Sequence, residues 1–439
     1  MTAYYCDVDA DFVAGRDGTD GTTEVLTGPG GLQIAIRGGG GAAGEFKAGG
    51  LVAGDILYVK GTTGLVSRLV KVLIATNGNT PNAWEIGDVV RDNTAGTHWT
   101  GKVVQERDNV ATGLSGNQQV LIQLDAPYDY DDINDNFGDG IENTTKAETG
   151  TIVQAADVTC VGIEFDTNEG TEAAGYLKIV GVNSSWVNDG TYAVLDGDGD
   201  ADHCIDRVDV DYWWFENLEQ KNSTGNLMER TSGYLYNHVR LNCYFHDTSG
   251  NGINDVQNGH NSNMILCKFA SCGIGIYNPK VQHIYACKFL DNTTGLWFSD
   301  VMGSVAGNVF HGNGTGIRSG AYLGTVAVLN NVFDGNTTVG LDHVSYALLA
   351  LGNRFTNHSG AGDFGFRAGA NVHGILGWNY FQANDTNYTA NGPILLSVNG
   401  AATNAEDQGD ADCGYVDSAG HDFNLAAGAT LRSVAVELD

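Results

Sequence analysis

The chain has 439 residues, of which 62 are Gly and only 5 are Pro; 42% are hydrophobic and 17% are charged. This balance excludes a disordered chain, which would have fewer apolar residues and more charge, and Gly without a three-residue period excludes collagen. The net charge of −31 argues against nucleic acid and anionic membrane surfaces as partners, because both would repel the protein. Abundant Gly predicts many tight turns between strands.

The first residues of the sequence predict no targeting signal. No basic patch and no apolar run precede Asp7, the first acidic residue, and no segment approaches the roughly 20 apolar residues that a membrane span requires. We therefore expect a protein that is made in the cytoplasm without a signal peptide.

Residues 1–150 are predicted to form an N-terminal β module. Turn-and-strand patterns at 53–60, 84–90 and 120–124 have irregular spacing, which favours a cap or docking region with an inserted small barrel or sandwich. The acidic, Asn- and Gly-rich segment 128–143 is interpreted as a loop.

Alternating acidic residues follow at Asp196, Asp198, Asp200 and Asp202. Carboxylates separated by small residues can converge on one Ca²⁺, so these four residues are the predicted metal ligands, and a solvated acidic turn is the alternative. The loop departs from an EF-hand, because Arg207 stands where the twelfth-position Glu would be. A weaker acidic group, for which we favour a solvated loop, comprises Asp131, Asp132, Asp135 and Asp139.

The second half of the chain is an internal repeat. Phe recurs at intervals of 20–26 residues, at Phe245, Phe269, Phe289, Phe310, Phe333, Phe355 and Phe381. The residue two positions earlier is Cys in the first three repeats and Asn in the last four. A Gly followed by a large apolar residue comes after most of these Phe residues, for example Gly316-Ile317.

A period of slightly more than twenty residues fits three short strands and their turns, and therefore one coil of a β-solenoid. Equivalent residues would then stack about 4.8 Å apart, with Phe on Phe and with amide hydrogen bonds between stacked Asn side chains. We expect Asn at the bends to adopt the left-handed backbone conformation and Gly to permit the sharp corner before the next strand. The repeat Cys residues are predicted to be buried free thiols.

This pattern resembles the right-handed parallel β-helix (pectin-lyase-like) superfamily over about 205–400. Asp17-Gly18-Thr19 and the segment 53–61 resemble its usual opening, and 422–432 resembles its last coil. The resemblance implies an all-β fold: a right-handed parallel β-helix of roughly ten coils at 151–400, behind the N-terminal module and before a C-terminal cap at 401–439.

A polar cluster after the first repeat Phe supplies the candidate catalytic residues Asp247, Asp255 and His260. Two carboxylates roughly 5–9.5 Å apart would suit glycoside hydrolysis. A lyase would instead need Ca²⁺ on acidic residues and a basic side chain, and Arg240 and Lys268 lie nearby in the repeat.

The match to polygalacturonase-type motifs is incomplete. Only Gly259-His260 is similar to them, and Asn261 follows where those motifs have Gly. Polar residues at the corners of coils, which any β-helix has, are the alternative interpretation.

Aromatic residues give a further candidate surface. Tyr212-Trp213-Trp214-Phe215 and Trp297 could stack on sugars or anchor a subunit interface. An alternating strand with half of its aromatic side chains in the core explains the first group equally well.

Two classes of function follow from the resemblance. The first is a structural virion protein of a tailed phage, a capsid-surface decoration or a spike, that forms a homotrimer, contacts other capsid or tail proteins and lies on the virion surface. The alternative is a polysaccharide lyase or glycoside hydrolase, including a tailspike depolymerase that binds host-surface polysaccharide. The absent signal peptide and the incomplete catalytic motif favour the first.

Overall fold

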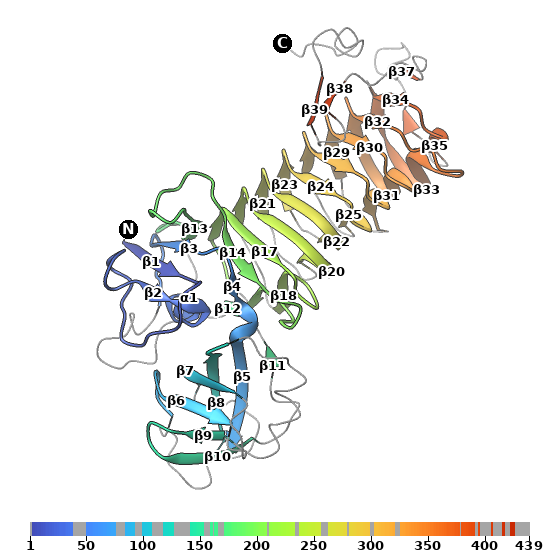
Figure 1. The fold of residues 1–439 in the computed structure, drawn as a ribbon. Helices are drawn as coiled ribbons and strands as arrows, with labels where there is room; N and C mark the ends of the chain where they lie inside the picture. The colour runs from blue at the N-terminus through green and yellow to red at the C-terminus, as the bar shows by residue number, and fades with distance from the viewer. Residues whose placement is uncertain are drawn as a thin grey trace. The chain divides into compact units, whose positions relative to one another are not determined.

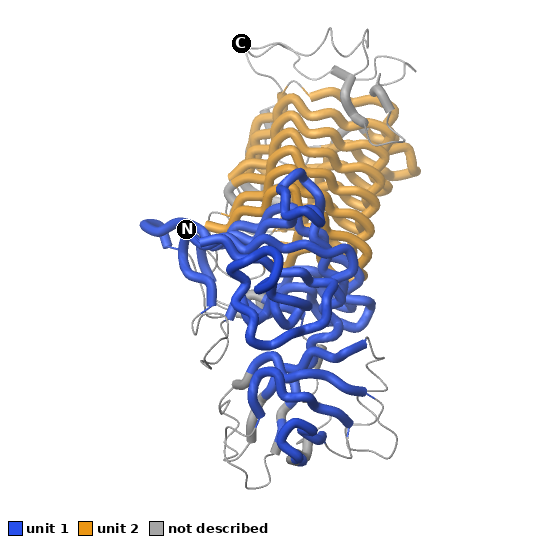
Figure 2. The backbone as a smooth tube through the Cα atoms, turned by 60° about the vertical axis from the view of Figure 1, so that its left-hand side comes forward, with its two compact units in different colours: residues 1–235 blue, residues 236–439 orange. Residues whose placement is uncertain are grey.

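The computed structural model divides the chain into two compact units, Met1–Leu235 and Tyr236–Asp439 (Figure 2). The residues that it describes are 2–37, 50–75, 84–92, 99–107, 117–126, 141–152, 159–160, 162–165, 171–208, 210–232, 237–255, 262–278, 281–298, 303–320, 325–377, 379–390, 394–395, 405–406, 415–417 and 422–425. Among them, no helix is long and apolar enough to cross a membrane.

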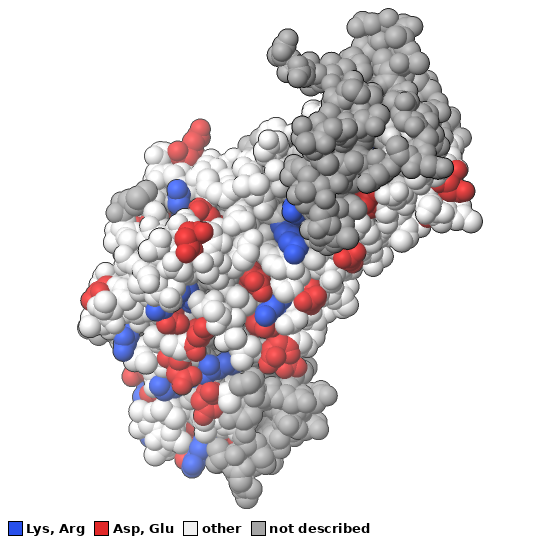
Figure 3. Space-filling view, turned by 45° about the horizontal axis from the view of Figure 1, so that its top comes forward, with Lys and Arg blue, Asp and Glu red and all other residues white. Residues whose placement is uncertain are grey.

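The predicted fold class is confirmed. The chain is a parallel β-solenoid of about 11 turns with a small antiparallel sheet near the N-terminus (Figure 1). Acidic side chains (Asp and Glu) and basic side chains (Lys and Arg) are interspersed on the face drawn in Figure 3.

Parallel pairing in unit 1 begins close to the N-terminus. β1 (Ala3–Asp7) pairs with β3 (Ile56–Lys60), which pairs with β13 (Leu177–Gly181), and β13 pairs with β16 (Trp213–Glu216). The first strands of the predicted N-terminal module are therefore part of the parallel ladder, which begins before the expected start at residue 151. The remaining parallel strands of unit 1 are β2 (Leu26–Thr27), β4 (Gly64–Leu65), β12 (Ile163–Phe165), β14 (Ala193–Asp196), β15 (Ile205–Val208), β17 (Leu218–Lys221) and β18 (Met228–Ser232).

An antiparallel sheet is inserted between these strands. Its seven strands are β5 (Leu69–Ala75), β6 (Val89–Asp92), β7 (Thr100–Arg107), β8 (Asn117–Leu124), β9 (Ile141–Asn143), β10 (Glu148–Ile152) and β11 (Thr159–Cys160), in the order β10-β9-β6-β7-β8-β5-β11. Alternating residues of β5 (Val70, Val72 and Ile74) pack with Trp84 and Trp99 in its core. β10 also pairs with β5, so six of these strands close into a ring, which is the small barrel that the sequence predicted with a sandwich as its alternative.

A ten-residue helix, α1 (Gly28–Arg37), precedes this insertion, and a short 3₁₀ helix, η1 (Val66–Arg68), leads into β5. The first turn of α1 contains three Gly residues and a Pro, which are typical of turns, so its sequence gives no clear helix signal. Gln33 makes two hydrogen bonds with the backbone of Glu164 in β12: its amide donates to the carbonyl and its oxygen accepts from the N–H. These bonds hold the buried helix against the parallel ladder.

In unit 2, each coil contributes one strand to each of three parallel sheets (Figure 1). The first sheet contains β19 (Val239–Leu241), β21 (Ser262–Ile265), β23 (Val281–Tyr285), β26 (Ser304–Ala306), β29 (Thr325–Leu329), the second halves of β31 (Val339–Leu351) and β33 (Phe364–Gly377), and β36 (Ile394–Leu395). The second sheet contains the first halves of β20 (Tyr244–Asn254) and β22 (Lys268–Tyr277), then β24 (Lys288–Leu290), β27 (Val309–His311), β30 (Val332–Asp334), β32 (Arg354–Thr356), β34 (Tyr380–Gln382) and β37 (Ala405–Glu406). The third sheet contains the second halves of β20 and β22, then β25 (Thr294–Phe298), β28 (Thr315–Ser319), the first halves of β31 and β33, and β35 (Thr386–Ala390). A separate antiparallel pair, β38 (Tyr415–Asp417) and β39 (Asp422–Leu425), follows.

The seven repeat Phe side chains form one interior column, as predicted. Successive ring centroids lie 4.6–5.0 Å apart, the ring planes are within 9° of parallel, and every one of these residues is 0% exposed. This spacing matches the separation of neighbouring strands, so each ring stacks on the ring of the next coil.

Two Asn ladders run beside the Phe column and confirm the predicted amide hydrogen bonds. In one, the amide of Asn308 donates to Asn331 and that of Asn331 donates to Asn353, at 2.9 and 3.0 Å. Each ladder Asn also accepts a backbone N–H from the coil before it. The left-handed bend is one residue earlier than expected: Asn330, with φ 53°, precedes the ladder residue Asn331.

The repeated Gly residues serve close packing, which corrects the prediction that they permit a corner. At Gly316, which does not have a positive φ, an added Cβ would lie 2.4 Å from the carbonyl oxygen of Gly340 and 2.9 Å from the ring of Phe333. Gly is therefore required because neighbouring coils and the Phe column approach too closely for a side chain.

The prediction of buried free thiols is confirmed for the repeat residues Cys243, Cys267 and Cys287, and Cys6, Cys204 and Cys272 are also buried and free.

Candidate functional site

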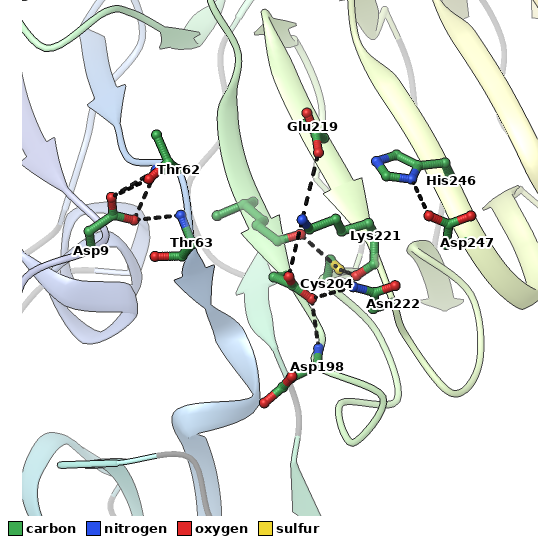
Figure 4. A network of polar contacts seen from close by, with 12 residues as sticks. Asp9, Thr62, Thr63, Asp198, Cys204, Glu219, Lys221, Asn222, His246 and Asp247 are labelled. Atoms are coloured by element: carbon green, nitrogen blue, oxygen red, sulfur yellow. Dashed lines mark hydrogen bonds and ion pairs between the residues drawn. The ribbon is translucent and has the colours of Figure 1, made fainter.

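The four predicted metal ligands do not converge. Asp196 is 8% exposed, and its carboxylate lies 3.3 Å from Nζ of Lys221 and accepts hydrogen bonds from the amide of Asn222 and the backbone N–H of Asp198 (Figure 4). Within the described residues, which include all of 196–202, no three His, Cys, Asp or Glu side chains form a group that could hold a metal ion.

The other members of the loop have separate environments. Asp202 is exposed, and Asp198 adopts a left-handed φ of 53°. Burial, with a smaller effect from Asp196, raises the pKa of Asp198. The Ca²⁺ site therefore gains no support from the geometry and stays a prediction, which a melting curve with and without EDTA would check. The weaker acidic group at 131–139 lies outside the described residues.

The predicted catalytic residues also lie in different environments. Asp247 is exposed, and its carboxylate is 2.7 Å from Nδ1 of His246 (Figure 4). Asp255 is 5% exposed and lies 3.7 Å from Arg240, which is 0% exposed. An interior Arg240 cannot act as a base toward an external polysaccharide. His260 lies outside the described residues.

The aromatic strand follows the alternating pattern. Trp213 and Phe215 are fully buried, whereas Tyr212 and Trp214 are partly exposed. Trp297 is also partly exposed, on the third sheet. Half of the aromatic side chains of the strand are thus part of the core, and the other half are accessible.

The side of the second sheet of unit 2 that faces away from the Phe column carries several ionisable side chains. On each strand, the residues before and after the buried Phe point away from the Phe column, because side chains alternate along a strand. Of the residues directly after the Phe, His246 and His311 are partly exposed and the others are buried. The residues after the Phe form an in-register column: His246, Ala270, Leu290, His311, Asp334, Thr356 and Gln382. We call this surface the His–Asp face.

A hydrogen-bonded pair, His311 and Asp334, lies in the middle of this face. Nδ1 of His311 donates to Oδ2 of Asp334 at 3.0 Å, and Thr356 and Asn357 donate to Oδ1 at 2.6 and 2.7 Å. Asp334 is 3% exposed, whereas the His311 side chain remains 24% exposed. A buried carboxylate with all of these donors fixes the orientation and the tautomer of the imidazole.

The pair shifts both pKa values in the direction that favours an ion pair. Burial alone would raise the pKa of Asp334, but hydrogen bonds from His311, Thr356 and Asn357 outweigh it, so the pKa is lowered. The hydrogen bond with Asp334 raises the pKa of His311 above its usual 6.5, with further help from the charge of Asp291. A partly exposed His whose pKa is raised in this way can exchange protons with a ligand.

Two lysines lie on the same face, in the column of residues before the Phe. Lys268 and Lys288 are in-register neighbours on successive coils, and Lys268 is 4.3 Å from the ring centre of Tyr244. Neither lysine forms an ion pair with any residue that the structure describes. The face therefore combines a proton-exchanging His with cations that can bind an anionic ligand.

Sequence reasoning missed His311 and Asp334, because their contact joins residues 23 positions apart on different coils. The signal was present in the repeat: each follows a repeat Phe directly, so the alignment of the coils places them in one column.

Comparison with known proteins supports the fold only. No family model and no curated protein matches the sequence. The structure is similar to that of pectate lyase Pel9A, with a TM-score of 0.53 and 13% identity over 98% of this chain and 90% of that chain.

Two other solved structures have TM-scores below 0.5. The alginate lyase from Paenibacillus sp. str. FPU-7 has a TM-score of 0.40 and 14% identity, over 53% of this chain and 88% of that chain. The mannuronan C-5 epimerase AlgE4 A-module from Azotobacter vinelandii has a TM-score of 0.26 and 14% identity, over 56% and 85%. Together with the stacked coils, the first similarity establishes that this chain has the pectin-lyase-like parallel β-helix fold.

Proposed function

We propose that this chain is a carbohydrate-active enzyme that acts on a polysaccharide at the His–Asp face of unit 2. The observation that carries the proposal is the His311–Asp334 pair, in which a buried carboxylate orients an accessible imidazole and raises its pKa. Such an imidazole serves as a general base or acid.

A lyase reaction fits this chemistry better than hydrolysis. Glycoside hydrolysis uses two carboxylates about 5–9.5 Å apart, one on each side of the bond, whereas the central group here is a His–Asp pair. In elimination from a uronate, neutral His311 would take the proton from the carbon next to the carboxylate. The carbon–carbon double bond would form as the bond to the glycosidic oxygen breaks, and the leaving oxygen would take a proton from water. Lys268 and Lys288 would bind the substrate carboxylate.

The test is turnover of a panel of acidic and neutral polysaccharides, measured both as reducing ends and as ultraviolet absorbance of the new double bond. We expect His311→Ala to lower kcat about 10²- to 10⁴-fold. His283→Ala, which removes an exposed His from the first sheet, is the control and should leave turnover unchanged. Reducing ends without the double bond would replace elimination by hydrolysis, and equal rates in both variants would contradict the role of His311.

The pH profile gives an independent check. His311 must be neutral to accept a proton, so kcat/KM should rise with pH through an apparent pKa above 6.5. Asp334→Asn removes the main cause of the raised pKa, so the rise should move to lower pH while the maximum falls. A rise that stays in place would contradict the assignment.

The structural virion role remains the second candidate. The unbroken Phe column and Asn ladders would give a stiff rod, which suits a capsid decoration or spike. Its homotrimeric assembly, its contacts with other virion proteins and its location on the virion surface stay predictions. Absence of turnover on the whole panel, with co-purification with particles, would favour this role.

A further inference from the structure

The third sheet of unit 2 presents a different outward column. The residues directly after its buried apolar positions are Asn254, Tyr277, Trp297, Arg318, Asp342 and Arg367, and they pair in register from coil to coil. Aromatic and guanidinium groups thus occupy neighbouring coils on a surface that the His–Asp face does not include.

Trp297 holds the guanidinium of Arg318. The Cζ atom of Arg318 lies 4.7 Å from the centre of the Trp297 ring, and the edge of Tyr277 packs against Trp297 with centroids 5.2 Å apart and an interplanar angle of 85°. Stacking on an aromatic face restricts the long Arg side chain and leaves the N–H groups of the fork available. Arg318 is exposed, so these groups face solvent.

Arg367, two coils further on, is paired with a carboxylate, unlike Arg318. Its Nε and Nη2 donate to the two carboxylate oxygens of Asp342 at 2.9 and 2.7 Å, and this contact raises the pKa of Arg367. Asp342 therefore neutralises Arg367, whereas Arg318 makes no ion pair with any described residue. Asp342 is also the in-register neighbour of Arg318, but its carboxylate is bound by Arg367, so among the described residues Arg318 is a pre-oriented cation without an ion pair.

We propose that Arg318, held by Trp297, binds the carboxylate of a uronate-containing polysaccharide on the third sheet. A planar guanidinium matches a carboxylate through two parallel hydrogen bonds, and the neighbouring aromatic rings suit the apolar face of a sugar. This site goes beyond the proposed function, because it lies on another sheet and requires binding without turnover.

The geometry of the guanidinium, rather than the net charge of the protein, favours a carboxylate at this site. Repulsion from the acidic surface is screened beyond about 8 Å at physiological salt, so a short-range contact between Arg318 and one carboxylate survives. Nucleic acid, with a phosphate at every step on each strand, depends on many cations at once. Arg318 and Arg367 are about 10 Å apart along the axis by the strand spacing, and only the first is available.

Calorimetric titration with oligogalacturonate tests the site, with the methyl-esterified oligomer as the uncharged match and a His311→Ala background to prevent turnover. We expect Arg318→Ala to weaken binding of the acid form about tenfold. The native chain should bind the ester no more tightly than Arg318→Ala binds the acid form. Arg367→Ala, whose charge is already neutralised, should change affinity less than twofold. Asp342→Asn frees Arg367 and should strengthen binding.

Folding of each variant is checked by its melting curve, and Arg318→Lys provides a second variant that keeps the charge but loses the fork. It should bind with intermediate affinity. Equal binding of acid and ester, unchanged affinity in Arg318→Ala, or equal affinity for a single-stranded oligonucleotide would overturn the proposal. Turnover by the native chain without binding at Arg318 would overturn this site and leave the proposed function standing. Binding at Arg318 without turnover by the native chain would overturn the proposed function and leave this site standing.

Discussion

His311 and His358 lie two coils apart in unit 2 and differ completely in environment. His311 is on the outer face, where Asp334 raises its pKa. His358 is 0% exposed inside the coils and takes a position in an Asn ladder, where burial lowers its pKa to about 4. The comparison teaches that the inner columns repeat neutral, mutually bonded side chains, whereas the outer columns vary from coil to coil and carry the charged groups.

The largest effect should come from interrupting an inner column. Phe310 is 0% exposed and stacks on rings 4.6 and 5.0 Å away, so Phe310→Ala should lower the free energy of unfolding by about 3–5 kcal/mol. Val309→Ala, at the neighbouring outward position, should cost about 1 kcal/mol or less. Urea denaturation followed by circular dichroism measures both, and similar losses would contradict the distinction between inner and outer columns.

Acidification should destabilise the folded chain through the buried His358. Nε2 of His358 accepts from the amide of Asn336, and Nδ1 donates to Asn384, so protonation would turn Nε2 into a donor facing a donor. The unfolded chain binds this proton near pH 6.5 and the folded chain near pH 4, so stability should fall as pH drops through this interval, by up to about 3 kcal/mol.

The matched variant for this prediction is His358→Asn, which continues the Asn ladder without a titratable group. It should remove that part of the pH dependence of the melting temperature between pH 6.5 and 4. A variant whose curve follows that of the native chain would show that His358 does not cause the loss.

A single ladder amide should have a smaller effect. Asn331→Ala leaves the backbone N–H and the amide of Asn308 without their acceptor, which should cost about 1–3 kcal/mol. Asn330→Gly, at the exposed left-handed position beside it, should change stability by no more than about 0.5 kcal/mol. A larger loss of stability in Asn330→Gly than in Asn331→Ala would mean that the ladder contributes less to stability than the bend.

The inner columns were predictable from the sequence because stacking requires the same residue type at the same place in each coil. The Phe, Asn and Cys columns therefore followed from their spacing alone. The role of Gly316 did not, since the close approach of Gly340 and Phe333 involves other coils. The helix α1 was not predicted, since the Gly and Pro residues of its first turn are typical of turns.

The candidate site was harder to predict. Asp247 and Asp255 were chosen for their proximity in sequence, yet one is exposed and the other is buried beside Arg240. His311, Asp334, Thr356 and Asn357 come from three coils, and outward residues do not repeat. Only the alignment of coils on the Phe column brings such residues together.

The most direct test is the pH titration of the imidazole resonances by NMR, with His311→Ala and His358→Asn to assign the two signals. The account predicts that His311 titrates above pH 6.5 and that His358 stays neutral down to about pH 4. Titration of both side chains near pH 6.5 would contradict it, because the inner and outer columns would then impose the same environment.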